Sequence, residues 1–186
     1  MNDPYATQRG AIIRRVRKSR DMTLVGLSEK TGLSLSFISQ VERGITNPSL
    51  NSLRELAIAL DIPLSSFFEE GSSNNGPIVR KNERGILINN NSRLTYQLLS
   101  RDPNRNIELL LTRLEVGCTS AESPMIHKGE EAALVLQGEC KVELGHDKYE
   151  VKNGDSFYIN ENTPHKFTNT GNVPLVIVSA ISPPGF

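Results

Sequence analysis

The sequence predicts an α + β protein made of two domains in series, and three observations predict this class. Apolar residues recur at helical spacing through residues 1–70. The stretch GSSNNGP at residues 71–77 is rich in small and turn-forming residues, which is typical of a linker. Between residues 94 and 181, apolar and polar residues alternate with a period near two. We therefore expect a helical domain at 1–70, a linker at 71–79 and an antiparallel β-barrel domain at 80–186.

Five helices are expected in the helical domain. The first holds six cations between residues 9 and 20, with no acid before Asp21, and so offers a basic surface. Thr23 and Ser34 are suited to cap the second and third helices. Gly32 and Gly44 suit the ends of those helices.

The fourth helix is predicted by a Ser49 cap followed by apolar residues at helical spacing, and a fifth follows it. The apolar positions of these two helices are Leu53, Leu56, Ala57, Leu60, Ile62, Leu64 and Phe67. Helices as short as the second and third cannot stand alone in water, so they must pack against such neighbours.

The third helix has two chemically different sides. Its apolar positions are Phe37, Ile38 and Val41, and its polar positions are Ser36, Ser39, Gln40 and Arg43. A helix that enters the major groove of DNA needs short, hydrogen-bonding side chains on its exposed side. The alternative is an ordinary helical hairpin whose polar face is only solvated. The basic first helix favours DNA binding.

Residues 9–68 resemble the lambda-repressor-like helix-turn-helix family, over about a third of the chain. The resemblance is carried by Thr23, Leu27, Gly32, Leu33, Ser34, Ile38, Ser39, Val41, Glu42, Gly44, Pro48, Leu53 and Leu60. It implies binding to double-stranded DNA. The family usually has a Gln at the start of its second helix, which commonly touches a phosphate. Leu24 stands there in this sequence, so that contact is in doubt here.

The resemblance also implies roles for individual residues. Counted from the Ser34 cap, Leu35, Ser36 and Gln40 are expected to face base edges, with Ser39 nearby. Ser34 itself is also counted among the DNA-binding residues. Those expected to hold the sugar-phosphate backbone are Arg17, Thr23 and Arg43. Two copies of the chain would place two such helices on half-sites about one turn of DNA apart.

The second domain is predicted to consist of short strands. The segments with this pattern are LTYQLLS, IELLLTRLEV, AALVLQGECKVELG, DKYEVKNGD, SFYINENTPHKFTN and PLVIVSAI. Turn residues separate them and no helical pattern intervenes. Many short strands at such spacing imply an antiparallel sandwich or a small barrel.

The spacing of two histidines within these strands resembles the paired motifs of the cupin superfamily. The residues that match the first motif are Gly117, His127, Glu131 and Gly138, and those that match the second are Gly154, His165 and Asn169. The resemblance covers residues 107–182 and implies a double-stranded β-helix barrel.

His127, Glu131 and His165 form a candidate metal site for Fe, Zn, Ni or Mn. Met125 stands where the family has a further histidine, and a thioether is a poor ligand for a hard divalent ion. The alternative, which we favour, is a metal-free effector pocket. Its lining is expected to include Phe157 and Phe167, which otherwise belong to the core.

A helix-turn-helix domain joined to a cupin resembles a family of bacterial transcription regulators. The resemblance implies a homodimeric repressor without enzymatic activity, whose barrel senses a small-molecule effector. A polyamine or an amino-acid-related metabolite is the expected class, and Glu130, Glu131 and Asp155 are the candidate acids for an ammonium group.

The alternative to a transcription regulator is an enzyme, namely a mononuclear iron enzyme of the hydroxyphosphonate epoxidase type. It also joins a helical domain to a cupin, and His127, Glu131 and His165 would hold its iron. A metal-binding storage cupin is a third interpretation, which leaves the first 70 residues unexplained.

The composition bears on the kind of DNA-binding surface, on the cellular location and on the state of the cysteines. The 21 basic and 21 acidic residues balance, so DNA binding has to rest on a local basic surface. No apolar run approaches the roughly 20 residues that span a bilayer, and no secretory signal is seen, so a cytoplasmic protein without a membrane partner is expected. Cys118 and Cys140 lack metal-type spacing and are expected to be buried thiols.

Overall fold

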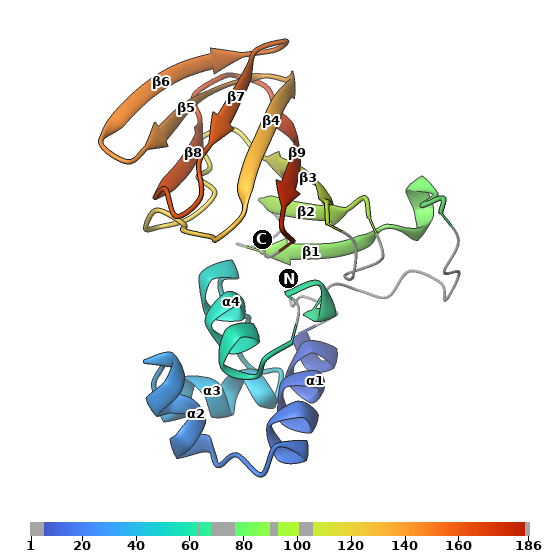
Figure 1. Ribbon diagram of the computed structural model, residues 1–186, viewed down its shortest axis with the longest axis vertical. Helices are drawn as coiled ribbons and strands as arrows, with labels where there is room; N and C mark the ends of the chain where they lie inside the picture. The colour runs from blue at the N-terminus through green and yellow to red at the C-terminus, as the bar shows by residue number, and fades with distance from the viewer. Residues whose placement is uncertain (1–5, 63, 68–76, 90–92, 101–105, 185–186) are drawn as a thin grey trace. The chain divides into compact units, whose positions relative to one another are not determined.

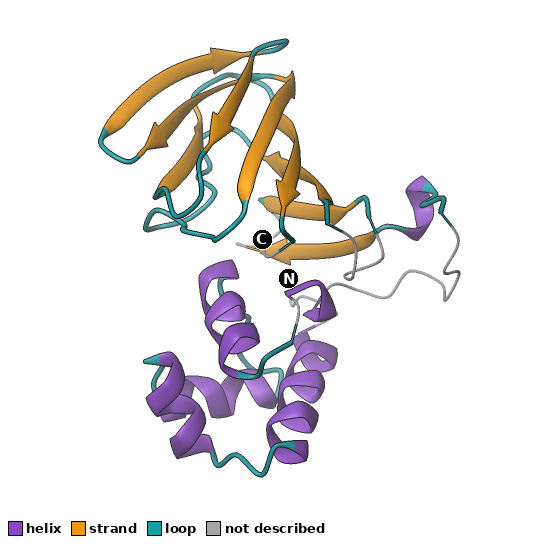
Figure 2. Ribbon diagram, viewed as in Figure 1, coloured by secondary structure: helices purple, strands orange, loops and turns teal. Residues whose placement is uncertain are grey.

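The computed structural model describes residues 6–62, 64–67, 77–89, 93–100 and 106–184 (Figure 1). The chain divides into two compact units, Met1–Phe67 and Phe68–Phe186. The first is helical and the second is built of strands (Figure 2). Most of the expected linker at 71–79 lies outside the described residues.

The helical unit contains four α-helices and one short 3₁₀ helix. They are α1 (Ala6–Ser19), α2 (Leu24–Thr31), α3 (Leu35–Glu42), α4 (Leu50–Ala59) and the 3₁₀ helix Leu64–Phe67. The expected fifth helix is therefore a single 3₁₀ turn rather than an α-helix. Leu64 and Phe67 are three residues apart and both buried, and 3₁₀ geometry places such residues on one side.

The predicted caps of α2, α3 and α4 are confirmed. The hydroxyl oxygens of Thr23, Ser34 and Ser49 each accept a hydrogen bond from a backbone N–H in the first turn of their helix. Gly32 ends α2 with φ of 70°, a left-handed conformation that glycine adopts at little cost. The chain can therefore turn directly from α2 into the Ser34 cap of α3.

The core of the helical unit forms where the four α-helices bring their apolar sides together. Its fully buried residues include Ile13, Leu27, Ile38, Leu56 and Leu60. Helix α1 comes so close to α3 that a side chain at Gly10 would collide with the carbonyl oxygens of Val41 and Glu42. Helix α1 therefore packs against the buried side of α3, and the opposite side of α3 stays exposed.

The second unit contains two antiparallel sheets. Its strands are β1 (Gly85–Asn89), β2 (Leu94–Leu98), β3 (Glu108–Leu114), β4 (Glu130–Gln137), β5 (Glu139–Leu144), β6 (Asp147–Lys152), β7 (Ser156–Ile159), β8 (His165–Asn169) and β9 (Leu175–Ser182). A 3₁₀ helix, Lys81–Glu83, precedes β1. The first sheet has the order β1-β2-β3-β9-β4-β7 and the second the order β6-β5-β8 (Figure 1). The predicted antiparallel β architecture is confirmed.

Inward and outward residues alternate along the central strands of the large sheet. In β9 the buried positions are Leu175, Ile177, Ser179 and Ile181. In β4 they are Glu131, Ala133 and Val135. A carboxylate and a hydroxyl therefore stand among apolar side chains inside the second unit, and each must find a hydrogen-bond partner there. Among the described residues no helix is long and apolar enough to cross a bilayer.

Candidate functional site

The exposed side of α3 carries the residues that were expected to meet DNA bases. Leu35 is 43% exposed, Ser36 is exposed, and Ser39 and Gln40 are half-buried. Phe37 is half-buried and Ile38 and Val41 are buried, so these side chains anchor the helix to the domain. Because Ser34 caps the N-terminus of α3, the positive end of the helix dipole lies beside the exposed Leu35 and Ser36.

Gln40 is held in place by a residue beyond its own helix. The Thr46 hydroxyl donates a hydrogen bond to Gln40 Oε1 at 2.9 Å. A glutamine that reads adenine needs one acceptor and one donor in a defined plane. The bond to Thr46 orients this plane, while the amide NH₂ and the second lone pair of Oε1 are available to a base.

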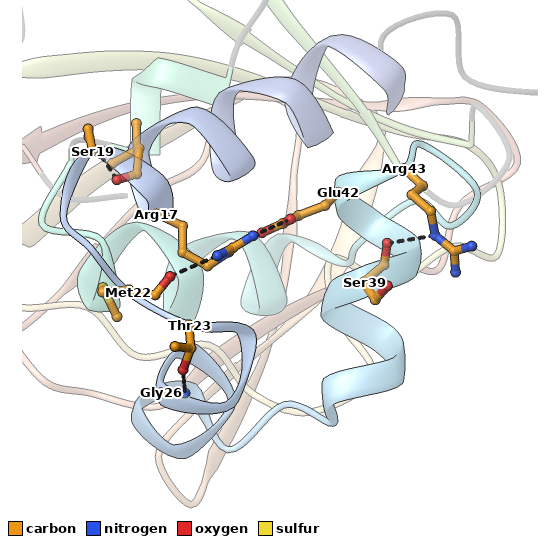
Figure 3. A network of polar contacts seen from close by, with 9 residues as sticks. Arg17, Ser19, Met22, Thr23, Gly26, Ser39, Glu42 and Arg43 are labelled. Carbon is orange, nitrogen blue, oxygen red and sulfur yellow. Dashed lines mark hydrogen bonds and ion pairs between the residues drawn. The ribbon is translucent and has the colours of Figure 1, made fainter.

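Arg17 lies in a different place from the other predicted DNA residues. Its Nε and Nη2 donate to the two carboxylate oxygens of Glu42 at 2.6 and 2.9 Å, and its Nη1 donates to the Met22 carbonyl at 2.7 Å (Figure 3). The side chains of Arg17 and Glu42 are 10% and 6% exposed. Hydrogen bonding to Glu42 raises the pKa of Arg17 further. This placement favours a structural role, in which Arg17 joins α1 to the end of α3.

Thr23 lies at the start of α2 and Arg43 at the end of α3. Arg43 is exposed, and only its Nε is tied to the helix, through a hydrogen bond of 3.2 Å to the Ser39 carbonyl (Figure 3). Thr23 is also exposed, and its hydroxyl oxygen accepts the Gly26 N–H at 3.0 Å. Both side chains can therefore reach a phosphate next to α3 or α2.

The second unit holds a cluster of three buried residues, His127, Glu131 and His165. His127 precedes β4, Glu131 lies near its start, and His165 begins β8. One ligand atom from each residue lies within 4.8 Å of the others. The two imidazole rings are edge to face, with centroids 4.8 Å apart. The fold therefore brings together the three residues that the cupin-like spacing predicted.

The backbone decides which nitrogen each histidine turns toward the cluster. His127 Nδ1 lies 2.7 Å from the Gly129 carbonyl, and His165 Nδ1 lies 2.9 Å from the Thr163 carbonyl. A carbonyl can only accept, so both Nδ1 atoms carry the hydrogen. Each ring then presents Nε2 to the cluster. His127 Nε2 faces the Glu131 carboxylate, to which it donates in this arrangement, whereas a metal bound through Nε2 would need the lone pair of that nitrogen.

Glu131 is held on both of its oxygens. The Ser179 hydroxyl donates to Oε1 at 2.6 Å, and His127 Nε2 lies 3.1 Å from Oε2. Burial alone would raise the pKa of this carboxyl group, but the bonds to His127 and Ser179 and the nearby imidazoles outweigh burial and lower its pKa. Glu131 is therefore a carboxylate at neutral pH.

Three further side chains surround the cluster. Met125 is buried, and its backbone exchanges two hydrogen bonds with His165. Phe167 is buried and its ring lies 5.8 Å from the His165 ring, while Phe157 packs edge to face against Phe167 at 5.5 Å. Phe167 is thus next to the cluster, and Phe157 lies behind it, in contact with Phe167.

The donor set fits a divalent metal. Two imidazole Nε2 atoms and one carboxylate converge, and both imidazoles are oriented by backbone carbonyls. A set of two histidines and one carboxylate suits Fe(II), Zn, Ni or Mn and leaves coordination positions open. The same groups also suit an organic ligand, because they offer a charged acceptor and two nitrogens inside an apolar wall.

Sequence reasoning missed Ser179 and Thr46, and it named Glu42 only as a residue of the helix-turn-helix resemblance, not as the partner of Arg17. Ser179 and Glu42 lie 48 and 25 residues from their partners, whereas Thr46 lies six residues from Gln40, beyond the end of α3. For Ser179 a signal existed, because a serine occupies a core-facing position of the apolar strand PLVIVSAI. A polar residue at such a position requires a partner.

Two family descriptions match the chain. Residues 13–67 match the helix-turn-helix family and residues 110–181 match the cupin domain family. The first segment runs from the second half of α1 to the end of the helical unit, and the second runs from β3 to β9.

Similarity to known proteins extends over nearly the full chain. The transcriptional regulator PuuR of Escherichia coli is 28% identical over 178 residues, which are 95% of this chain and 96% of that protein. An HTH_3 family transcriptional regulator from Vibrio cholerae aligns with a TM-score of 0.74 and 21% identity, over 96% of each chain. The Fe(II) form of HppE aligns with a TM-score of 0.51 and 19% identity, over 95% of this chain and 98% of that one. The chain therefore combines a helix-turn-helix segment with a cupin segment that follows it, and over 95% of its length it is similar to the regulator PuuR.

Proposed function

We propose that this protein is a sequence-specific DNA-binding transcriptional regulator, a repressor, whose cupin domain senses a small molecule. The observation that carries the proposal is the intact helix-turn-helix unit, with α3 anchored by its apolar side and its capped, polar side exposed. Similarity to regulators along the whole chain supports it. Such a protein works beside the chromosome, in the bacterial cytoplasm.

Base reading is assigned to Leu35, Ser36 and Gln40, with Ser39 nearby. Gln40, oriented by Thr46, suits a two-bond contact with adenine, and Leu35 suits a thymine methyl group. Phosphate contacts are assigned to Arg43 and Thr23. Arg17 is assigned to positioning, because its bonds to Glu42 and Met22 fix α1 against α3.

The test separates base reading from phosphate binding. A binding site is first selected from random DNA with the wild-type protein. Gln40→Ala should then weaken binding to this site by about 1–3 kcal/mol and hardly change binding to unrelated DNA. Arg43→Ala should weaken binding to every sequence and reduce the salt dependence by about one counterion.

Arg80→Ala, in the second unit, is the matched control for loss of one exposed cation, and it should bind like wild type. The proposal fails if the wild-type protein selects no sequence. The residue assignment fails if Gln40→Ala weakens selected and unrelated DNA equally.

We assign effector binding to the three buried residues His127, Glu131 and His165, which we call the barrel cluster. Phe157 and Phe167 are assigned to the wall of this binding site. Of the three candidate acids only Glu131 is buried, while Glu130 accepts the Tyr158 hydroxyl and Asp155 accepts the Lys152 N–H. A polyamine or an amino-acid-related metabolite would place its ammonium group near Glu131. A divalent metal held by the same three residues would instead attract an anionic or carbonyl group.

Native mass spectrometry of the purified protein, combined with metal analysis, identifies a retained small molecule or metal in one experiment. His127→Ala and Glu131→Gln should bind the selected DNA like wild type but lose its response to that ligand. A ligand can shift the DNA affinity only if it binds the two states of the protein unequally. A normal response in both variants would place the sensor elsewhere.

The second candidate function is a mononuclear iron enzyme of the hydroxyphosphonate epoxidase type. The convergence of His127, Glu131 and His165 is the specific observation that favours it. Consumption of oxygen by the iron-loaded protein with a hydroxyphosphonate substrate, absent in His165→Ala, would establish this activity. Selection of a DNA sequence without any such turnover would exclude it.

A further inference from the structure

One cation of the basic first helix lies inside the helical unit, where it contacts the chain that follows α3. Four of the six cations between residues 9 and 20 are exposed, whereas Arg9 is only 1% exposed. A buried guanidinium is costly unless it is hydrogen-bonded, and Arg9 Nη2 donates to Asn47 Oδ1 at 2.8 Å. Burial lowers the pKa of Arg9 to about 10, which still leaves the group charged at neutral pH. Arg9 is therefore too buried to bind a phosphate, and its printed partner lies beyond the end of α3.

Asn47 belongs to residues 43–49, which join α3 to α4 and which we call the α3–α4 loop. This loop packs against the start of α1 at a second point. Gly44 has φ of 69°, and a side chain there would come within 2.8 Å of Thr7. The first turns of α1 therefore hold the loop both by a hydrogen bond and by a close backbone approach.

The α3–α4 loop also carries the residue that orients the base-reading side chain. Thr46 precedes Asn47, and its hydroxyl donates to Gln40 Oε1 at 2.9 Å. The Ile45 N–H donates to the Gln40 carbonyl at 3.0 Å, so the loop is bound to both the backbone and the side chain of this residue. A glutamine side chain has several rotatable bonds, and fixing it before binding lowers the entropy cost of a base contact. A continuous series of contacts therefore links the buried Arg9 to Gln40 through two neighbouring loop residues.

We propose that Arg9 is a positioning residue for base reading. Its bond to Asn47 holds the α3–α4 loop, and the loop holds Thr46 where its hydroxyl meets Gln40. The proposal rests on the proposed function, because it requires that Gln40 reads a base. A merely structural role of Arg9 would affect binding to all DNA sequences alike, whereas a positioning role acts at one base pair.

The test measures how strongly the intact chain discriminates at single base pairs of its selected DNA site. The base pair that Gln40 reads is the one at which Gln40→Ala loses its preference. Arg9→Met removes the hydrogen-bond donor but keeps a long side chain, and it should lower discrimination at this base pair by about ten-fold. Discrimination at the other base pairs should change by less than about two-fold, because those contacts are independent of Gln40.

Variants of Thr46 test whether the same series of contacts is involved. Thr46→Val removes the hydroxyl and should cause the same selective loss, whereas Thr46→Ser keeps the hydroxyl and should discriminate like wild type. A variant with both Arg9→Met and Thr46→Val should discriminate no worse than Thr46→Val alone, because both changes break one series of contacts. Lys30→Met is the matched control for a lost cation in this unit, since Lys30 is exposed, and it should keep wild-type discrimination at every base pair.

Nuclear magnetic resonance of the free chain adds a measurement that does not depend on DNA. A nuclear Overhauser contact between the Gln40 amide and the Thr46 methyl group should be present in wild type and in Lys30→Met. It should be lost in Arg9→Met. If thermal melting shows that Arg9→Met is unfolded, Asn47→Ala replaces it, because it removes the acceptor at an exposed position and should cause the same selective loss.

Each outcome decides the proposal. Unchanged discrimination at the Gln40 base pair in a folded variant, or an equal loss at every base pair, overturns it. A contact between Gln40 and Thr46 that survives in Arg9→Met also overturns it. If wild type selects no DNA sequence, the proposed function fails together with this proposal. If wild type selects a sequence that Arg9→Met reads equally well, only this proposal fails.

Discussion

At the scale of single residues, the barrel cluster depends on a serine that supports a buried carboxylate. Ser179 donates a 2.6 Å hydrogen bond to Glu131, and both residues are buried. Ser179→Ala should lower the free energy of unfolding of the barrel by about 2 kcal/mol, because a buried charged acceptor loses its donor. Urea denaturation of the intact chain measures this loss. Ser156→Ala, at an exposed position of β7, should change stability little. Equal effects of the two substitutions would contradict a supporting role.

Cys140 illustrates what burial does to a single reactive group. It is fully buried on β5, and burial, assisted by the charge of Glu150, raises the pKa of its thiol to about 12. The thiolate is the reactive form, so the folded protein at pH 8 should not be alkylated at Cys140. Peptide mapping after treatment with iodoacetamide checks this. The same treatment in urea is the control and should label Cys140 completely, whereas rapid labelling of the folded chain would show that the strand opens.

At the scale of elements, the position of α3 depends on a glycine in α1. A side chain at Gly10 would collide with the Val41 and Glu42 carbonyl oxygens at the end of α3. Gly10→Ala should therefore destabilise the helical unit by about 1–3 kcal/mol and weaken DNA binding. In Gly26→Ala, the new Cβ would lie 3.5 Å from its nearest neighbour, the Thr23 hydroxyl. This control should be neutral or more stable by about 0.5 kcal/mol. Circular dichroism during thermal unfolding measures the melting temperatures of the two variants. Equal melting temperatures would mean that α1 can move away from α3.

At the scale of the whole molecule, the chain consists of two units with separate cores. Ile13 and Leu56 belong to one core, and Leu110 and Ile177 to the other. Calorimetry of the intact chain should resolve two transitions. Gly10→Ala should shift only one of them and Ser179→Ala only the other, because distant sites without shared partners add independently. A single transition moved by both substitutions would show that the two units unfold together.

Local patterns in the sequence determined most of the elements and several of the site residues. Helical spacing and the capping residues Thr23, Ser34 and Ser49 predicted three helix starts, because a cap acts within one turn of backbone. Alternation predicted the strands, since successive side chains of a strand point to opposite faces. The spacing of His127, Glu131 and His165 predicted the barrel cluster through its resemblance to cupins.

Only the tertiary structure decided the partners of these residues. The bond from Ser179 to Glu131 depends on the register between β9 and β4, and a shift of one residue would turn Ser179 to the outside. The ion pair between Arg17 and Glu42 depends on how closely α1 approaches α3. The hydrogen bond from Thr46 to Gln40 depends on the path of the chain after the end of α3. The expected fifth helix is a four-residue 3₁₀ turn, in which Leu64 and Phe67 are both buried. Such partners meet through packing and strand pairing between distant segments, whereas caps and periodic patterns act within a few residues.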